Sequence, residues 1–276
     1  MYIEELHLGV TRMCTIECEH CLRGDRKNEY MSKETINNVL SEVKHIGKLL
    51  ITGGEPLLAT NQIKEIINVI KKNDIKVDNV ILISNATVLN DDVIEVLYEL
   101  KKMPNFKFML SYDMFHYLEL QRLNLLEKRN FNAKIFIDKF GAKEYGKDEK
   151  KRLVDQVQYK RLGRAKNITD EMLAYINSLS NTKYVLSDDT MDYFIRTVSV
   201  DYHANKNSIT GVITVDVNGN ITGYGESFED EDDEVEEYDS NINKLGLTTA
   251  TENYIEYYDT KCEKYEVNGC KVIRRK

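Results

Sequence analysis

Three cysteines lie close together near the start of the chain. Cys14, Cys18 and Cys21 form a C-x3-C-x2-C pattern. Thiolate sulfur is a soft ligand, so three thiolates in one short loop can hold a single metal centre. A structural zinc site usually has four protein ligands, and here the local count of cysteines stops at three. A [4Fe–4S] cluster has four iron corners, so three cysteines would leave one iron open to an outside ligand.

A histidine lies inside the same pattern. His20 can be considered as a fourth zinc ligand, but it stands between Cys18 and Cys21. From that position its ring would have difficulty reaching the ion that the neighbouring cysteines hold. On spacing alone, a zinc knuckle or a chance grouping of cysteines stays open beside the iron–sulfur interpretation.

A second motif, Gly-Gly-Glu-Pro, follows the next candidate strand. Gly53 and Gly54 permit backbone conformations that other residues avoid, and they let a ligand approach the main chain. Glu55 adds a hydrogen-bond acceptor, and Pro56 ends the loop stiffly. Alone, the motif can be a tight turn. One strand after the cysteine loop, it indicates a shared site.

Together the two motifs resemble the radical S-adenosylmethionine (SAM) superfamily. The resemblance implies that the three cysteines hold a [4Fe–4S] cluster whose open iron binds the amino and carboxylate groups of SAM. It also implies cleavage of SAM to a 5′-deoxyadenosyl radical that abstracts a substrate hydrogen. His20 takes a position that is usually aromatic and near the adenine. The 53–56 loop would contact the methionyl part, with Glu55 accepting a hydrogen bond from the SAM amino group.

Later strand ends resemble the superfamily less sharply. Asn85 stands where relatives often have Thr-Asn-Gly, and Ser111 stands where a polar residue touches the ribose or the methionyl carboxylate. The Gly-Arg-Ala segment is expected near the adenine, which makes Gly163 and Arg164 cofactor-binding candidates.

Two further residues are catalytic candidates. Asp113 and His116 follow the fourth candidate strand, and they could contact the substrate or exchange a proton, since histidine titrates near neutral pH. Equally, Asp113 could cap the helix that follows it.

Short apolar runs alternate with helix-like periods over the first two-thirds of the chain. The predicted strands are 6–10, 48–51, 79–84, 106–111, 134–138 and 154–159. The predicted helices are 32–46, 61–72, 91–101, 117–128 and 146–152, with helix starts at Ser32 and Asn90. This alternation predicts an α/β fold, a partial (β/α)6 TIM-like barrel with its chemistry at the carboxyl ends of the strands.

The pattern changes after residue 166, which predicts a barrel core over 1–166 and a small α+β extension over 167–276. A helix is expected at 168–179, and a β-hairpin over 208–217 and 221–224, turning at Asn218-Gly219-Asn220. The hairpin resembles the auxiliary-cluster extension of peptide- and protein-modifying radical SAM enzymes. The acidic run 226–239 is interpreted as a solvated loop.

Only Cys262 and Cys270 lie outside the first loop. Two cysteines are too few for a second cluster, so we expect a cluster-free remnant of that extension. Free thiols, a disulfide and a partial zinc site all stay open for this pair.

Charge and composition argue against some functional classes of protein. The net charge of −8 argues against a dedicated nucleic-acid binder. The sequence has no apolar run of membrane-spanning length and no signal-like start, and its five cysteines suit a reducing compartment, so we expect a cytoplasmic protein without membrane contact.

The expected function is hydrogen abstraction from a peptide substrate. Two alternatives are a small-molecule substrate such as a sugar or nucleoside and, from another class, a zinc-binding interaction module. A flavodoxin or ferredoxin is the expected electron donor. It could dock on four basic residues flanking the cysteine loop: Arg12, Arg23, Arg26 and Lys27.

Overall fold

The computed structural model describes most of the chain, in several stretches. These are residues 1–145, 156–160, 163–179, 183–187, 193–194, 203–204, 208–222, 239–267 and 270–275. The predicted helix at 146–152 and nearly all of the acidic run 226–239 lie outside the described residues.

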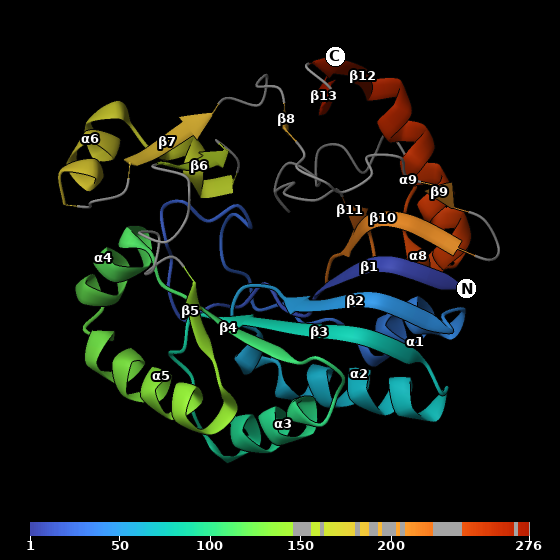
Figure 1. The fold of residues 1–276 in the computed structure, drawn as a ribbon, viewed down its shortest axis with the longest axis horizontal. Helices are drawn as coiled ribbons and strands as arrows, with labels where there is room; N and C mark the ends of the chain where they lie inside the picture. Colours follow the sequence, from blue (N-terminus) through green and yellow to red (C-terminus); the bar gives the residue numbers. More distant parts are fainter. Residues whose placement is uncertain are drawn as a thin grey trace.

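A mainly parallel sheet forms the centre of the molecule (Figure 1). Its order is β11-β10-β1-β2-β3-β4-β5. The five strand pairs from β10 to β5 are parallel, whereas β11 and β9 pair antiparallel with β10. The bounds are β1 Tyr2–Gly9, β2 His45–Thr52, β3 Lys76–Ser84, β4 Lys107–Ser111, β5 Lys143–Tyr145, β9 His203–Ala204, β10 Ser208–Val215 and β11 Ile221–Thr222. The predicted α/β fold is confirmed.

Helices cover one face of this sheet (Figure 1). They are α1 Lys33–Ser41, α2 Thr60–Lys72, α3 Asp91–Lys101 and α5 Leu126–Phe140. Alternate strand residues such as Leu6, Leu49 and Leu82 are fully buried and belong to one hydrophobic core with apolar residues of these helices. Since successive side chains of a strand point to opposite faces, this core leaves the other face to the polar strand residues, among them Glu5 and Lys48, which form an ion pair.

Side-chain caps fix where the helices begin. Ser32, Asn90 and Asp113 each accept a hydrogen bond at 2.9 Å from the backbone N–H three residues later. Such caps pair a donor that the helix itself cannot pair. The predicted starts at Ser32 and Asn90 are confirmed.

Three predicted elements need correction. Residues 134–138 are not a strand but part of α5, in which Ala133, Phe136 and Phe140 bury one helical face. A short apolar run fits either period, and the helical one prevails here. The predicted helix 117–128 is two helices, α4 Met114–Arg122 and α5, separated where Asn124 takes a left-handed φ of 54°.

The first predicted helix is also too long. It was expected to reach residue 46, but α1 ends at Ser41 and β2 begins at His45. The apolar residues of β2 therefore include Ile46, which is fully buried in the sheet.

The sixth parallel strand of the sheet comes from an unexpected part of the chain. Predicted strand 154–159 is found as β6 Gln156–Lys160, which pairs with β7 Lys183–Ser187 in a separate sheet. Between them lie η3 Gly163–Asn167 and α6 Asp170–Leu179. The sixth parallel strand of the central sheet is therefore not β6 but β10 of the C-terminal region, which pairs with the edge of β1 opposite β2. Strand pairing thus crosses the expected boundary at residue 166, which stays a prediction.

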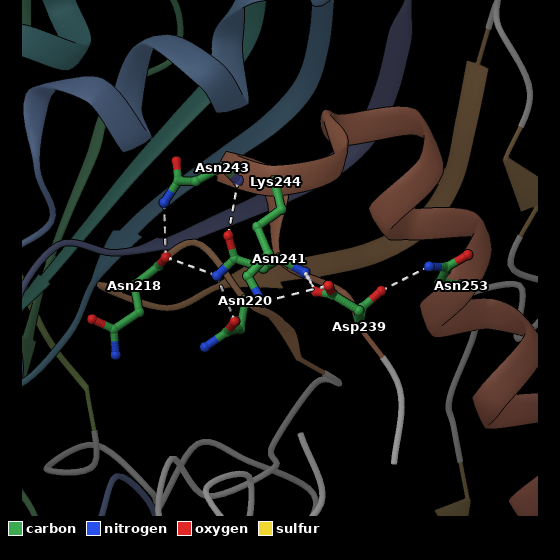
Figure 2. Close-up of polar contacts among 7 residues, drawn as sticks. All are labelled: Asn218, Asn220, Asp239, Asn241, Asn243, Lys244 and Asn253. Atoms are coloured by element: carbon green, nitrogen blue, oxygen red, sulfur yellow. Dashed lines mark hydrogen bonds and ion pairs between the residues drawn. The ribbon is translucent and has the colours of Figure 1, made fainter. Parts of the chain in front are cut away.

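The predicted hairpin is confirmed, because β10 pairs antiparallel with β11. Its turn is fastened by amide side chains (Figure 2). The carbonyl oxygen of Asn218 accepts hydrogen bonds from the side-chain amides of Asn241 at 3.1 Å and Asn243 at 2.9 Å. Asn243 also donates to Thr35 of α1 at 3.0 Å. This network connects the turn to α1 and to the segment 241–243.

The C-terminal elements are α8 Ile242–Leu245, α9 Leu247–Lys261, β12 Cys262–Val267 and β13 Cys270–Arg275, with β8 Tyr193–Phe194 beside β13. Cys262 lies opposite Arg275, and Cys270 lies opposite Val267, at the two ends of one ladder. At about 3.4 Å per residue, the two cysteines are roughly 17 Å apart along it. Disulfide bonding needs Cα atoms within about 7 Å, so a disulfide between this pair is excluded in this fold.

Among the described residues, no helix has the length and apolar character needed to cross a bilayer.

Candidate functional site

The cysteine loop follows β1 and is largely enclosed. Cys18 is 5% exposed, and Cys14 and Cys21 are partly buried. Burial, together with the charges of Glu55 and Cys21, raises the pKa of Cys14 to about 12. Burial also raises the pKa of Cys18 well above its usual value, aided by Asp113, Cys21 and Cys14.

Cys14, Cys18 and Cys21 belong to one loop, and the charge of Cys21 helps to raise the pKa of both Cys14 and Cys18. A metal centre that bound these three sulfurs would displace their protons, since cysteine binds metals as the thiolate. The donor set therefore fits an iron–sulfur cluster.

The loop is held from the end of β3. The side-chain amide of Asn85 donates to Cys14 Sγ at 3.5 Å and to Thr15 Oγ1 at 3.1 Å. Its Oδ1 accepts from the backbone and hydroxyl of Thr87 at 3.0 and 2.6 Å. Asn85 is thus fixed in its orientation, and it joins the cysteine loop to the third strand.

A second attachment comes from α4. The backbone N–H of Glu17 donates to Glu119 Oε1 at 3.1 Å. Glu119 is held in turn by Arg122, whose Nε and Nη2 donate at 2.7 and 2.8 Å. Ile16, Cys18 and Leu120 are buried together beside this contact.

A third attachment comes from the Gly-Arg-Ala segment. Arg164 donates from its backbone to the Cys21 carbonyl and from Nε to the Cys18 carbonyl, both at 3.1 Å. Gly163 has a φ of 52°, and a Cβ there would lie 2.6 Å from the Cys21 oxygen. Both residues therefore pack directly on the cysteine loop, and the adenine contact expected of them stays a prediction.

The Gly-Gly-Glu-Pro loop runs against the backbone that precedes Cys14. Gly54 donates to the Thr11 carbonyl at 2.7 Å, and Glu55 donates to the Met13 carbonyl at 2.8 Å. A Cβ at Gly53 would lie 2.5 Å from the Thr11 oxygen, and one at Gly54 would lie 2.4 Å from the Met13 oxygen. The glycines are thus required by the close approach of two loops of this chain.

Glu55 is fully buried and satisfies three donors. Oε1 accepts from the Leu57 N–H at 3.0 Å and the Ser84 hydroxyl at 2.8 Å, and Oε2 accepts from the Asn85 N–H at 2.7 Å. Burial raises the pKa of Glu55 to about 7, although these hydrogen bonds oppose the rise. Pro56 follows at the start of η1 Pro56–Leu58 and is buried. Glu55 therefore links the ends of β2 and β3.

One carboxylate joins the two histidines of the site. Asp113 Oδ2 lies 3.2 Å from His20 Nε2, and Oδ1 lies 2.8 Å from His116 Nδ1. Burial alone would raise the pKa of Asp113, but the charges of His116 and His20 hold it well below its usual value. The His20 ring stacks on Phe115 with centroids 4.6 Å apart. Asp113 also caps α4, so the capping interpretation is confirmed.

Ser111 ends β4 and is partly buried. Next to this strand end is a residue that sequence reasoning missed. Arg129 is fully buried on α5, with Nη1 2.5 Å from Glu144 Oε1 and its guanidinium 4.0 Å above the Tyr112 ring. Within the described residues, its Nε and Nη2 have no hydrogen-bond partner. The buried face of α5 (Arg129, Asn132, Ala133, Phe136, Phe140) follows helical spacing, and reading 134–138 as a strand hid it.

The expected docking face of the electron donor is partly wrong. Arg12 is only 5% exposed and lies near Glu29 rather than in solvent. Arg26 is available at the surface, with its Nε 3.0 Å from Glu17 Oε1.

Comparison with known proteins points to one family. Residues 8–137 match the family model described as the radical SAM superfamily. This range includes the cysteine loop, the Gly-Gly-Glu-Pro loop, Asn85, Ser111, Asp113 and His116.

The sequence is also similar to individual proteins. GTP 3',8-cyclase of Clostridium perfringens is 28% identical over 163 residues, which is 53% of this chain and 49% of the relative. A protein of unassigned function from Methanocaldococcus jannaschii is 30% identical over 102 residues, which is 36% of each chain. The match thus spans half or less of the length of these relatives.

Two solved structures are similar in part. SuiB of Streptococcus suis bound to its precursor peptide SuiA has a TM-score of 0.42 and 13% identity, covering 80% of this chain and 59% of that one. The enzyme anSMEcpe with bound AdoMet and the Cp18Cys peptide has a TM-score of 0.41 and 18% identity, covering 68% and 50%.

Proposed function

Since this chain belongs to the radical SAM superfamily, whose cofactors are a [4Fe–4S] cluster and SAM, we propose that it reductively cleaves SAM to a 5′-deoxyadenosyl radical that abstracts a hydrogen atom from a substrate. The observation that carries the proposal is one largely enclosed loop that holds three cysteines and packs against the Gly-Gly-Glu-Pro loop through the Gly54–Thr11 and Glu55–Met13 backbone hydrogen bonds. The cysteine loop is attached to β3, α4 and η3 through Asn85, Glu119 and Arg164.

The cysteines Cys14, Cys18 and Cys21 would be the cluster ligands. Asn85 would keep donating to the Cys14 sulfur, and such hydrogen bonds are one means by which a protein tunes the potential of a cluster. Arg164 holds the carbonyls of the loop and places a positive charge behind it. These residues fix the ligand geometry before any cofactor arrives, which reduces the cost of reorganisation.

The carboxyl ends of the strands would bind SAM. We assign the methionyl part to Gly53, Gly54, Glu55 and Pro56, the ribose or carboxylate end to Ser111, and the adenine end to His20, Gly163 and Arg164. Glu55 already accepts three hydrogen bonds, so a SAM amino group would take the remaining acceptor site of its carboxylate. The buried position of Glu55 makes such a charge-assisted bond stronger than it would be in water.

Asp113 and His116 are the proposed catalytic residues. They would contact the substrate or exchange a proton, since the His116 ring is partly exposed and held by Asp113. A histidine whose Nδ1 faces a carboxylate has its tautomer and ring orientation set by that contact.

A peptide is the proposed substrate, supported by the C-terminal hairpin that resembles the extension of peptide-modifying relatives. A nucleoside or similar small molecule is the second candidate. It is favoured by the similarity to GTP 3',8-cyclase over 53% of this chain. The family match decides against a zinc-binding interaction module as the main role. A flavodoxin or ferredoxin is the proposed electron donor.

The test is anaerobic reconstitution followed by measurement of iron and of 5′-deoxyadenosine after chemical reduction with SAM. Wild type should hold about four irons per chain, the content of one such cluster, and should release 5′-deoxyadenosine. Cys14→Ala should lose this product. Full iron content and full SAM cleavage in Cys14→Ala would show the assignment to be wrong.

A further inference from the structure

A second group of metal ligands overlaps the cysteine loop. Cys18, His20 and His116 each offer one ligand atom, and these atoms all lie within 4.8 Å of one another, so the expectation that His20 would not reach an ion held by a neighbouring cysteine is corrected for Cys18. The three residues come from two separate segments, the cysteine loop and α4. Cys14 and Cys21 are not members of this group, so it is distinct from the three-cysteine set.

The two histidines of the group are already oriented by one carboxylate. Asp113 Oδ2 faces His20 Nε2 at 3.2 Å, and Asp113 Oδ1 faces His116 Nδ1 at 2.8 Å. Histidines that bind metals usually give their other ring nitrogen to a carboxylate or carbonyl, which sets the tautomer and makes the ligand more basic. Here one aspartate contacts His20 Nε2 and His116 Nδ1, so the ion would bind through His20 Nδ1 and His116 Nε2.

The donor set and its surroundings suit zinc. Zn²⁺ accepts both cysteine sulfur and histidine nitrogen, at about 2.3 Å and 2.0–2.1 Å, which places tetrahedral ligand atoms roughly 3.5 Å apart. Side-chain adjustments of about an ångström would therefore complete the site. Cys18 and His20 are 5% and 8% exposed, and His20 stacks on Phe115, so two of the three ligands are held in place by packing.

We propose that in the cluster-free protein Cys18, His20 and His116 bind a single zinc ion, and that this ion competes with the iron–sulfur cluster for Cys18. One thiolate cannot serve both centres in this geometry, so the two occupied states exclude each other. Zinc then acts as a reversible block on cluster assembly. The zinc site concerns the protein before the cluster is built, so it does not depend on SAM cleavage or on any substrate, whereas the competition rests on the proposed assignment of Cys18 to the cluster.

The first experiment uses the cluster-free full chain, prepared anaerobically with a chelator that is then removed. Co²⁺ is titrated in as a spectroscopic substitute, and Zn²⁺ is used to displace it. One bound ion per chain with the sulfur-to-cobalt charge-transfer intensity of a single thiolate is expected. The intensity of a three-thiolate site would overturn the proposal, and so would the absence of binding.

Variants identify the ligands. His116→Ala should weaken zinc binding at least ten-fold, whereas Cys14→Ala should change it less than two-fold. Asp113→Asn keeps a good helix cap but removes the charge between the rings, so a loss of about 10- to 100-fold is expected. A loss of zinc binding in Cys14→Ala with little change in His116→Ala would assign the zinc to the three cysteines and overturn the proposal.

Competition is measured by iron uptake during reconstitution. Pre-loading wild type with one equivalent of Zn²⁺ should slow cluster formation several-fold, and His116→Gln should remove this zinc effect. His116→Gln also guards against misfolding, because glutamine is a good helix former but is not a usual zinc ligand; its thermal unfolding midpoint is recorded in parallel. Equal slowing in wild type and His116→Gln would overturn the competition.

Discussion

The two regions that contain cysteine differ in how other elements of the fold contact them. In the N-terminal region, the loop that holds three cysteines is attached to β3, α4 and η3, each time through a polar side chain. In the β12–β13 ladder, Cys262 and Cys270 lie at opposite ends. The comparison teaches that the number of cysteines alone does not make a metal site, and that the loop that holds them must also be kept in place by other elements.

The largest expected effect is the difference in iron content between cysteine substitutions in the two regions. Cys262→Ala combined with Cys270→Ala should keep about four irons per chain and normal SAM cleavage, because one cluster needs only the first loop. Cys18→Ala should lose the cluster. Both are measured by iron analysis and by 5′-deoxyadenosine formation. If wild type held about eight irons and the double variant lost half of them, an auxiliary cluster would be present. The two cysteine-containing regions would then both bind a cluster.

The next effect concerns the close approach of the two loops. Gly54→Ala would place a Cβ 2.4 Å from the Met13 oxygen, so the backbone before Cys14 must move. A drop of at least ten-fold in 5′-deoxyadenosine formation is expected, because misplaced reacting groups lose rate steeply.

Gly141→Ala is the matched control for that variant. Gly141 also has a positive φ, of 66°, but nothing lies within 4 Å of its added Cβ. It should lose about 1–2 kcal/mol of unfolding free energy from left-handed strain and retain SAM cleavage. Similar losses of activity in the two glycine variants would mean that the loop contact has no special role.

A smaller effect is expected at Glu55. Glu55→Ala removes a proposed acceptor of the SAM amino group, and charge-assisted hydrogen bonds contribute about 1.5–3 kcal/mol. SAM affinity, followed by anaerobic titration of the reconstituted protein, should fall roughly ten- to a hundred-fold.

The same change leaves the donors of Leu57, Ser84 and Asn85 without their carboxylate. Glu55→Gln keeps the size of the side chain and serves as the control for this structural role. An intact cluster with unchanged SAM affinity in Glu55→Ala would remove Glu55 from the binding site.

The smallest effect lies in the C-terminal region. Asn243→Ala removes side-chain hydrogen bonds to the Asn218 carbonyl and the Thr35 hydroxyl. Each such bond is worth about 0.5–1.5 kcal/mol, so about 1–3 kcal/mol of unfolding free energy should be lost in urea titrations. SAM cleavage should stay normal, and a large loss of cleavage would show that this network supports the site.

Local signals in the sequence predicted the framework of the site well. The caps Ser32 and Asn90 and the strands that end near Thr52, Ser84 and Ser111 were placed within a few residues, because capping chemistry and apolar periodicity are short-range properties. The helix at 134–138 was misassigned because a short apolar run fits both periods.

Local signals in the sequence did not predict the contacts between segments that are far apart in the chain. The pairing of β10 with β1 joins segments about 200 residues apart. The shared contact of Asp113 with His20 and His116 likewise depends on how α4 packs against the cysteine loop. Arg129 was missed because arginine on a helix is usually exposed, whereas here it is fully buried between Glu144 and Tyr112.

The position of β10 also has a consequence for folding during protein synthesis. The ribosome makes β1 first, and about 200 residues must follow before its partner β10 is complete; at roughly 5–20 residues per second this takes about 10–40 s. During that time one edge of β1 has unpaired N–H and C=O groups, which are a template for wrong strand pairing. Nascent chains of this protein are therefore most prone to aggregate before residues 208–215 emerge, and slower initiation or chaperone binding at β1 should increase the yield of folded product.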